Sequence, residues 1–194
     1  MYDFYGIYAS CRDAAWRCLT DFDVRTLPVK LKRAAERAGI RVVRDSKVHE
    51  LRRGERGASI YLPSGEWVIV YDDTQSTEES RMVIAHEFGH ILLGHEYKYR
   101  DSRFVCEGRK LKSEREADMF AVRILAPACV LHELSVTDAE TISKLCCIPR
   151  RTAAERARRM MLLESRNAYY KSELERKVRD SFAEYIEAQR YQKK

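Results

Sequence analysis

Apolar residues recur at intervals of three and four near the start of the chain, the spacing of one helix face. One such set covers residues 7–22, and a second follows Pro28 and stops before Gly39. The pattern then changes to short runs rich in Val, Ile and Tyr, at residues 40–43, 58–62 and 67–71. A Pro-Ser-Gly turn separates the last two runs. We therefore expect two helices, a strand and a β-hairpin, in that order.

The next apolar run contains a pair of histidines. Residues 86–90 read His-Glu-Phe-Gly-His, an HExxH pattern, and the surrounding apolar residues predict a buried helix that ends near Gly94. Residues four apart share a helix face, so His86 and His90 can present two imidazoles to one metal ion, with Glu87 beside the remaining coordination position. This is the donor set of a hydrolytic zinc site. The alternative is a pair of hydrogen-bonded core histidines.

A zinc site of this kind needs a third protein ligand, which is a histidine or a glutamate. The HExxHxxGxxH arrangement is excluded, because Leu93 and Glu96 stand where it requires glycine and histidine. A second predicted helix, capped by Ser113 and carrying an apolar stripe to about residue 125, offers glutamates instead.

Two glutamates of that helix compete for the metal. Glu114 and Asp118 are four residues apart, so Glu114 can coordinate the ion while Asp118 accepts the far N–H of a ligand histidine. Glu116 lies two residues from Glu114, and a regular helix cannot turn both toward one ion. We favour Glu114 as the ligand and expect Glu116 to be a capping or solvated residue.

The two helices together carry a family pattern. Residues 84–95 and 114–127 resemble the ImmA/IrrE family of zinc metallopeptidases, whose pattern is AHExGHxLLGH followed by ExEANxFAxxLLMP. The resemblance extends over about residues 27–160. Its departures are Asp118, where asparagine is common, and Ala126, where methionine is common.

The resemblance implies a gluzincin-like HExxH…ExxxD site. One zinc ion would be held by His86, His90 and Glu114, with Glu87 as the catalytic base. Many family members act on helix-turn-helix repressors of mobile elements. The chain is therefore expected to be a stand-alone zinc-dependent metalloendopeptidase, an anti-repressor that cleaves a separately encoded repressor and releases mobile-element or stress genes.

Two other functions stay open. The metal could be structural, in a binding module that sequesters a repressor without proteolysis. Alternatively, residues 136–194 could make the chain a DNA-binding regulator. These residues hold two short predicted helices around Pro149, and their basic surplus would suit a docking surface for an acidic protein or for DNA phosphates. Residues 150–194 contain 13 Lys and Arg against 7 Asp and Glu, whereas the first 149 residues contain 23 of each. The simpler interpretation is a solvated face with ion pairs.

The expected fold is α+β and zincin-like, with a small sheet, an HExxH helix and a mostly helical C-terminal part. We expect a metallopeptidase domain at 1–135, a small helical segment at 136–163 and a basic C-terminal helix at 164–194. The segment at 136–163 could be helix-turn-helix-like, and the simpler interpretation is a helical pair packed on the peptidase core. The long polar loop at 95–112 offers three candidate oxyanion stabilisers, for each of which a surface role is the simpler reading: His95, Tyr97 and Tyr99.

The composition of the chain also indicates in which cellular compartment the protein is expected. No apolar stretch approaches the length of a membrane span, and the N-terminus lacks the basic start and apolar core of a signal peptide. The six cysteines include no CxxC pair, and Cys146 is adjacent to Cys147. We expect reduced thiols and a cytoplasmic protein without membrane contact.

Overall fold

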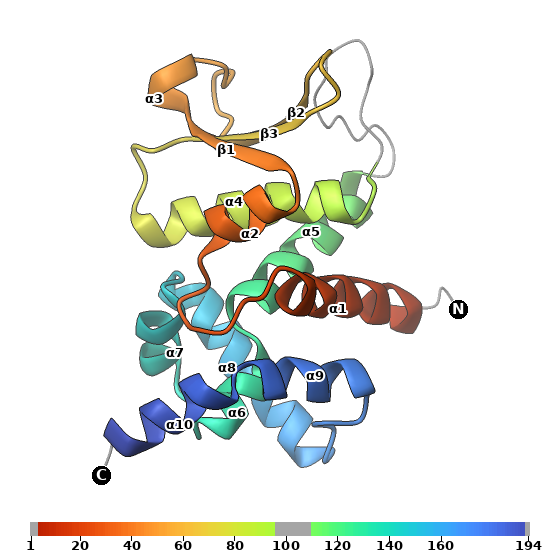
Figure 1. Cartoon of the computed structure of the whole chain (residues 1–194), viewed down its shortest axis with the longest axis vertical. Coiled ribbons are helices and arrows are strands. Elements are labelled where there is room, and N and C mark those ends of the chain that lie inside the picture. Colours follow the sequence, from red (N-terminus) through yellow and green to blue (C-terminus); the bar gives the residue numbers. More distant parts are fainter. Residues whose placement is uncertain (1–3, 96–109, 193–194) are drawn as a thin grey trace.

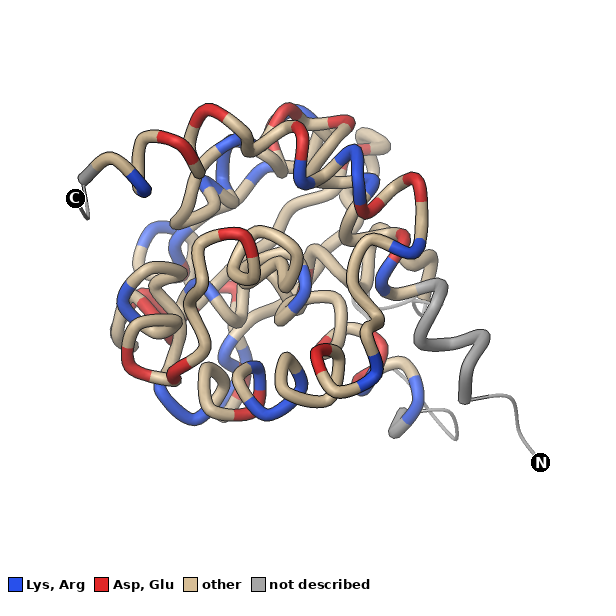
Figure 2. Tube along the Cα trace, turned by 90° about the horizontal axis from the view of Figure 1, so that it is seen from below, with Lys and Arg blue, Asp and Glu red and all other residues tan. Residues whose placement is uncertain are grey.

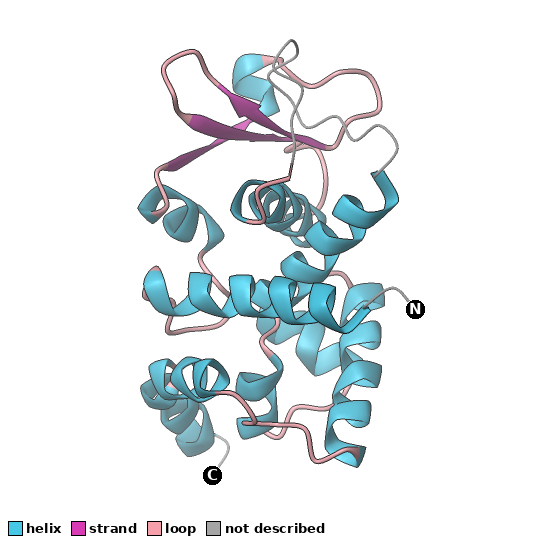
Figure 3. Cartoon of the chain, turned by 90° about the vertical axis from the view of Figure 1, so that its right-hand side faces the viewer, coloured by secondary structure: helices cyan, strands magenta, loops and turns pink. Residues whose placement is uncertain are grey.

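A small sheet lies as a separate layer over a helical body (Figures 1 and 3). The computed structural model describes residues 4–95 and 110–192. The strands are β1 (Ile40–Arg44), β2 (Gly57–Tyr61) and β3 (Trp67–Tyr71). The helices are α1 (Phe4–Asp21), α2 (Leu31–Arg37), α3 (Asp45–Val48), α4 (Thr77–Leu92), α5 (Lys110–Leu125), α6 (Ala128–Glu133), α7 (Ala139–Cys146), α8 (Arg150–Ser165), α9 (Glu173–Ser181) and α10 (Ala183–Gln192).

The sheet has the order β1-β3-β2, with β3 in the centre. The strand β3 runs parallel to β1, with Ile40 opposite Trp67, and antiparallel to β2, with Ala58 opposite Val70. The predicted hairpin is therefore present, and Gly65 adopts a φ of +87° in its turn. Four of the five residues of β3 are buried, as a central strand requires. Among the described residues β3 is the only strand that pairs with β2, so β2 is an edge strand of this part of the sheet.

The helix α4 lies between the sheet and α5. Its N-terminus is capped by Ser76, whose side chain accepts a hydrogen bond from the Glu79 N–H. Its end follows the prediction, because Gly94 adopts the left-handed conformation with a φ of +64°. Phe88 is fully buried and meets Phe120 of α5 edge to face at a ring separation of 6.0 Å. This packing brings the HExxH helix and the predicted ligand helix together.

The helix α5 begins earlier than the sequence suggested. It starts at Lys110, so Ser113 is a buried residue inside the helix and does not cap it. Glu116 is not a capping-box partner either, because its carboxylate lies 3.0 Å from Nε2 of His95. The predicted apolar stripe is confirmed as fully buried: Ala117, Phe120, Ala121, Ile124 and Leu125.

The helices α7 and α8 form a helical pair around a short turn at Cys147, Ile148 and Pro149. Cys147 takes the left-handed conformation that ends α7. The pair packs on the rest of the chain through a shared apolar core that includes Ile142 and Ile148, both fully buried. The division of the chain into a separate segment at residues 136–163 stays a prediction.

The prediction of a single helix over residues 164–194 is wrong. Two helices, α9 and α10, take its place, and Ser172 caps the first of them. Asn167 and Tyr170 have positive φ values of 45° and 58°, which a continuing helix cannot contain. The break near Phe182 lets the fully buried ring of this residue join the core.

The basic surplus of the C-terminal part is spread among acidic residues. Lys177 pairs with Glu173 at 2.8 Å, and Arg190 pairs with Glu133 of α6 at 2.8 Å. Figure 2 shows positive and negative residues interspersed along the surface helices. This is the arrangement of a solvated helical face.

Two negative findings concern the described residues only. None of their helices is long and apolar enough to cross a membrane. Their cysteines are all free thiols: Cys11, Cys18, Cys129 and Cys146 are buried, and Cys147 is half-buried.

Candidate metal centre

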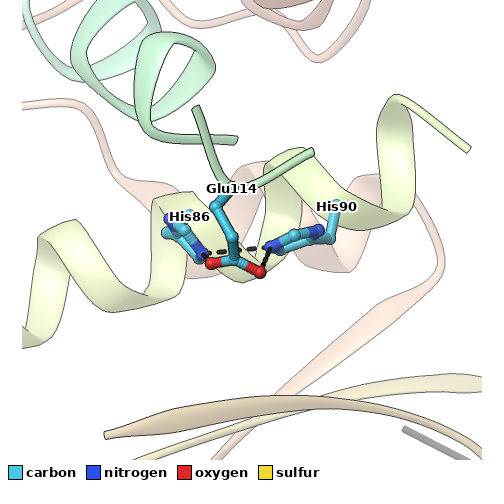
Figure 4. Close-up of side chains that lie close together, drawn as sticks. All are labelled: His86, His90 and Glu114. Carbon is cyan, nitrogen blue, oxygen red and sulfur yellow. Dashed lines mark hydrogen bonds and ion pairs between the residues drawn. The ribbon is translucent and has the colours of Figure 1, made fainter. Parts of the chain in front are cut away.

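Three side chains from two helices converge on one point (Figure 4). His86 and His90 project from one face of α4, and Glu114 reaches them from α5. The two Nε2 atoms are 3.0 Å apart. Oε2 of Glu114 lies 3.3 Å from Nε2 of His86, and its Oε1 lies 3.7 Å from Nε2 of His90. The sequence reasoning chose these three residues, and the structure brings them together.

These separations fit a single tetrahedral ion. Zinc bonds of about 2.0–2.1 Å to nitrogen and oxygen place neighbouring tetrahedral ligands roughly 3.3–3.4 Å apart. The three observed separations, from 3.0 to 3.7 Å, bracket that value. Within the described residues the cluster supplies two imidazoles and one carboxylate, which would leave the fourth position of a tetrahedral ion for a water molecule, as in hydrolytic zinc sites. The residues present therefore fit a metal ion.

The ligand tautomer of His86 is set by Asp118. Oδ1 of Asp118 lies 2.8 Å from Nδ1 of His86. A carboxylate can only accept, so Nδ1 of His86 carries a proton. Nε2 faces Glu114: it donates to this carboxylate when the ring is cationic, and in the neutral ring its lone pair is available to a metal ion. Asp118 thus occupies the position, outside the ligand cluster, that the sequence reasoning gave it.

A second chain of hydrogen bonds sets the tautomer of His90. Nδ1 of His90 lies 2.9 Å from Nδ1 of His95, whose Nε2 lies 3.0 Å from Oε2 of Glu116. The Glu116 carboxylate accepts a hydrogen bond from Nε2–H of His95. Nδ1 of His95 is then unprotonated and accepts a hydrogen bond from Nδ1–H of His90. The left-handed turn at Gly94 folds His95 back behind His90.

Two hypotheses about individual residues change as a result. Glu116 is the last member of this hydrogen-bond chain, two contacts away from His90 and on the side of the ring that faces away from Glu114. His95 uses both ring nitrogens for Glu116 and His90, which leaves neither for an oxyanion. The other two candidates for that role, Tyr97 and Tyr99, lie outside the described residues.

The carboxylates around the two histidines stabilise the protonated, positively charged form of the His86 ring. Burial lowers the pKa of His86, but hydrogen bonds to Asp118 and Glu114 and the charge of Glu87 outweigh it and raise the pKa to about 10. Burial and the charge on His86 lower the pKa of His90 to about 4. One ring is thus drawn toward a cationic state while its neighbour stays neutral.

Glu87 is held by a residue that the sequence did not reveal. Ser59 of β2 is 1% exposed, and its hydroxyl lies 2.8 Å from Oε2 of Glu87 and 3.1 Å from the main-chain oxygen of Glu87. Burial raises the pKa of Glu87, while the charge of His86 and the Ser59 hydrogen bond partly oppose this rise. The strand can come this close because residue 57 is glycine, where a Cβ would overlap Val83.

The site opens into a cleft of about 540 Å³, within the usual range of ligand sites. His86 and Glu87 line one side of it. The other walls come from three elements: the start of β2, with Gly57; α5, with Asp118; and α8, with Thr152. The proposed base and one histidine are therefore accessible from a single concave surface.

The fold and the site define a zincin-like protein with a candidate metal centre. A sequence model of the IrrE N-terminal-like domain family, Peptidase_M78, matches residues 35–161, and the chain belongs to this family. The resemblance seen in the sequence is thereby confirmed.

One solved structure supports the same fold. A Mycobacterium tuberculosis transcriptional regulator superposes with a TM-score of 0.52 at 17% sequence identity. The match covers 76% of this chain and 46% of that protein, so the chain spans less than half the length of this structural neighbour. A search of curated proteins gave no match.

Proposed function

We propose that the chain is a zinc-dependent metalloendopeptidase. His86, His90 and Glu114 hold the ion, Asp118 orients His86, and Glu87 is the catalytic base. The observation that carries this proposal is the three-ligand cluster with an acid next to one ligand on the wall of an open cleft. A purely structural zinc would use four protein ligands and would not need Glu87.

The base has the properties that peptide hydrolysis needs. A bound zinc ion would polarise the scissile carbonyl and lower the pKa of a water molecule. Glu87 then removes a proton from the attacking water and delivers it to the nitrogen of the leaving amine. Its raised pKa suits both steps, because a carboxyl that titrates closer to neutrality returns a proton more readily. Ser59 keeps the carboxylate in one place during both transfers.

The substrate we propose is a helix-turn-helix transcriptional repressor, whose cleavage would release mobile-element or stress-response genes. The family relationship supports this substrate. An extended segment of such a protein could add to the edge of β2, because Gly57 of this strand lines the cleft.

The arrangement of α8 favours a peptidase over a DNA-binding regulator. In a helix-turn-helix protein the first turn of the second helix contacts the bases. Here Arg151, in that turn, pairs with Glu79 of α4 at 3.1 Å, and Thr152 lines the cleft. The first turn of α8 is thus directed at the proposed active site.

The test compares the wild-type protein with the Glu87→Gln variant on a repressor encoded beside its gene. The wild type should cleave the repressor, a chelator should stop cleavage, and Glu87→Gln should keep its zinc but lose at least a hundredfold in rate. If the wild type binds the repressor and leaves it intact, sequestration replaces proteolysis. A steep salt-dependent shift of duplex DNA without cleavage would favour the DNA-binding regulator.

A further inference from the structure

The helix α8 contributes one wall of the cleft that contains the candidate metal centre. Arg151, Thr152 and Glu155 line the same cleft as His86 and Glu87. Their spacing of one and four residues places all three on one face of α8. In the view of Figure 1, β2 lies above α4 and α8 lies below it, so the cleft is bounded from both sides.

Hydrogen bonds from two arginines hold α8 against the rest of the chain. Arg81 of α4 donates from Nε to the carbonyl oxygen of Cys147 at 3.0 Å, in the turn before α8. Arg156, which is 6% exposed, donates from Nε to the carbonyl oxygen of Ala126 at 2.6 Å. Buried charged hydrogen bonds of this kind are costly to break. The backbone of α8 therefore has a fixed position relative to the site, and its cleft-facing side chains start from that position.

Besides Glu87, Asp118 and the Arg151–Glu79 pair, the cleft combines an apolar floor with two further charges of opposite sign. Met82 and Val83 of α4 and Val122 of α5 supply the apolar part. Glu155 on α8 and Arg56 before β2 are exposed and line the cleft from different sides. Neither forms an ion pair among the described residues, whereas Arg151 is neutralised by Glu79.

We infer that α8 selects the substrate: Glu155 pairs with a basic side chain of an extended polypeptide segment, and an apolar neighbour of that side chain packs on the floor of the cleft. This inference rests on the proposed function and names the chemistry of its substrate. Arg56, on the other side, favours an acidic side chain at a different position of the segment. Charges placed in this way fix the direction and register of a bound chain.

The test uses a mixture of short randomised peptides, with the zinc-loaded protein and mass spectrometry of the products. The wild type should enrich Lys and Arg at one position relative to the cleaved bond. Glu155→Lys should remove that preference or replace it with Asp and Glu, a change of about tenfold, because an attraction becomes a repulsion. The matched control is Glu187→Lys, an equal charge change at an exposed residue of α10, which should leave the profile unchanged. An identical profile for wild type and Glu155→Lys would overturn the inference.

A binding experiment separates this inference from the proposed function. Immobilised, zinc-loaded Glu87→Gln protein, with and without Glu155→Lys, selects peptides from the same mixture. Selection of basic peptides only when Glu155 is present supports the inference even if the wild type cleaves nothing. Cleavage by the wild type, combined with selection that ignores Glu155, would refute the inference and leave the proposed function intact.

Discussion

The Ser59 hydroxyl lies 2.8 Å from Oε2 of Glu87, and this contact joins the edge strand β2 to the helix that carries the proposed base. The same hydroxyl lies 3.1 Å from the main-chain oxygen of Glu87. A buried serine with both contacts fixes the side chain of Glu87 relative to its own backbone. Precise orientation of a base matters because small misplacements reduce the rate strongly.

Removal of the Ser59 hydroxyl should slow turnover without removing the metal. We expect Ser59→Ala to lower kcat by about tenfold to a hundredfold, the usual effect of losing a contact that orients an active-site group, with KM changed less. Zinc content should stay at the wild-type level. Ser64→Ala, an exposed serine of the same hairpin, is the control. A wild-type kcat in Ser59→Ala would show that turnover does not depend on the hydrogen bond between Ser59 and Glu87.

Loss of His95 should weaken metal binding. Glu116 orients His95, which in turn accepts a hydrogen bond from Nδ1 of His90, so His95→Ala frees the ring of His90 to rotate or change tautomer. Zinc affinity, measured by competition with a chelating dye, should fall about tenfold to a hundredfold. The control is His132→Ala, a histidine of α6 that stacks on Tyr169. Equal affinities in both variants would contradict the hydrogen-bond chain.

A methyl group at Gly89 should disturb the contact between the two ligand helices. An added Cβ would lie 3.0–3.2 Å from three side-chain carbons of Phe120, whose ring is fully buried. Overpacking in a core costs about 1–3 kcal/mol, which exceeds the roughly 1 kcal/mol that alanine gains over glycine in a helix. Gly89→Ala should therefore lower the free energy of unfolding in urea by about 1 kcal/mol. An unchanged or higher free energy of unfolding would mean that the Phe120 side chain can move away from the added methyl group without a cost in stability.

Thiol reactivity should single out Cys147 among the described cysteines. Burial raises the pKa of Cys11 to about 11 and those of Cys129 and Cys146 to about 12. These thiols stay protonated at pH 8, and thiolate is the form that reacts. The half-buried Cys147 should be alkylated first, as peptide mapping can show. Fast labelling of Cys146 in the folded protein between pH 7 and 9 would contradict the described packing.

The parts of the site that sequence could predict are local. The spacing of His86 and His90 on one helix requires only helical periodicity, and the choice of Glu114 over Glu116 required only the position of Asp118 one turn later. The strand at 40–43 and the hairpin were equally visible, because their β-rich runs are short and flanked by turn residues. Each of these features depends on neighbours within a few positions.

The features that escaped prediction depend on contacts between distant segments. The Ser59–Glu87 contact arises from the distance between β2 and α4, which only the packed structure defines. The role of His95 depends on the left-handed turn at Gly94 and on a partner from α5. The break between α9 and α10 places Phe182 in the core, and helical periodicity alone gave no sign of it.

The zinc content of matched variants decides whether Glu114, together with the two histidines, holds a metal ion. Wild type, Glu114→Gln and Glu116→Gln should be purified identically, dialysed against the same zinc buffer and analysed by mass spectrometry for metal per chain. Wild type and Glu116→Gln should each hold one zinc ion, with Glu116→Gln binding it more weakly, and Glu114→Gln should lose most of it. Full zinc occupancy in Glu114→Gln, or no zinc in the wild type, would contradict the metal centre on which the proposed hydrolysis depends.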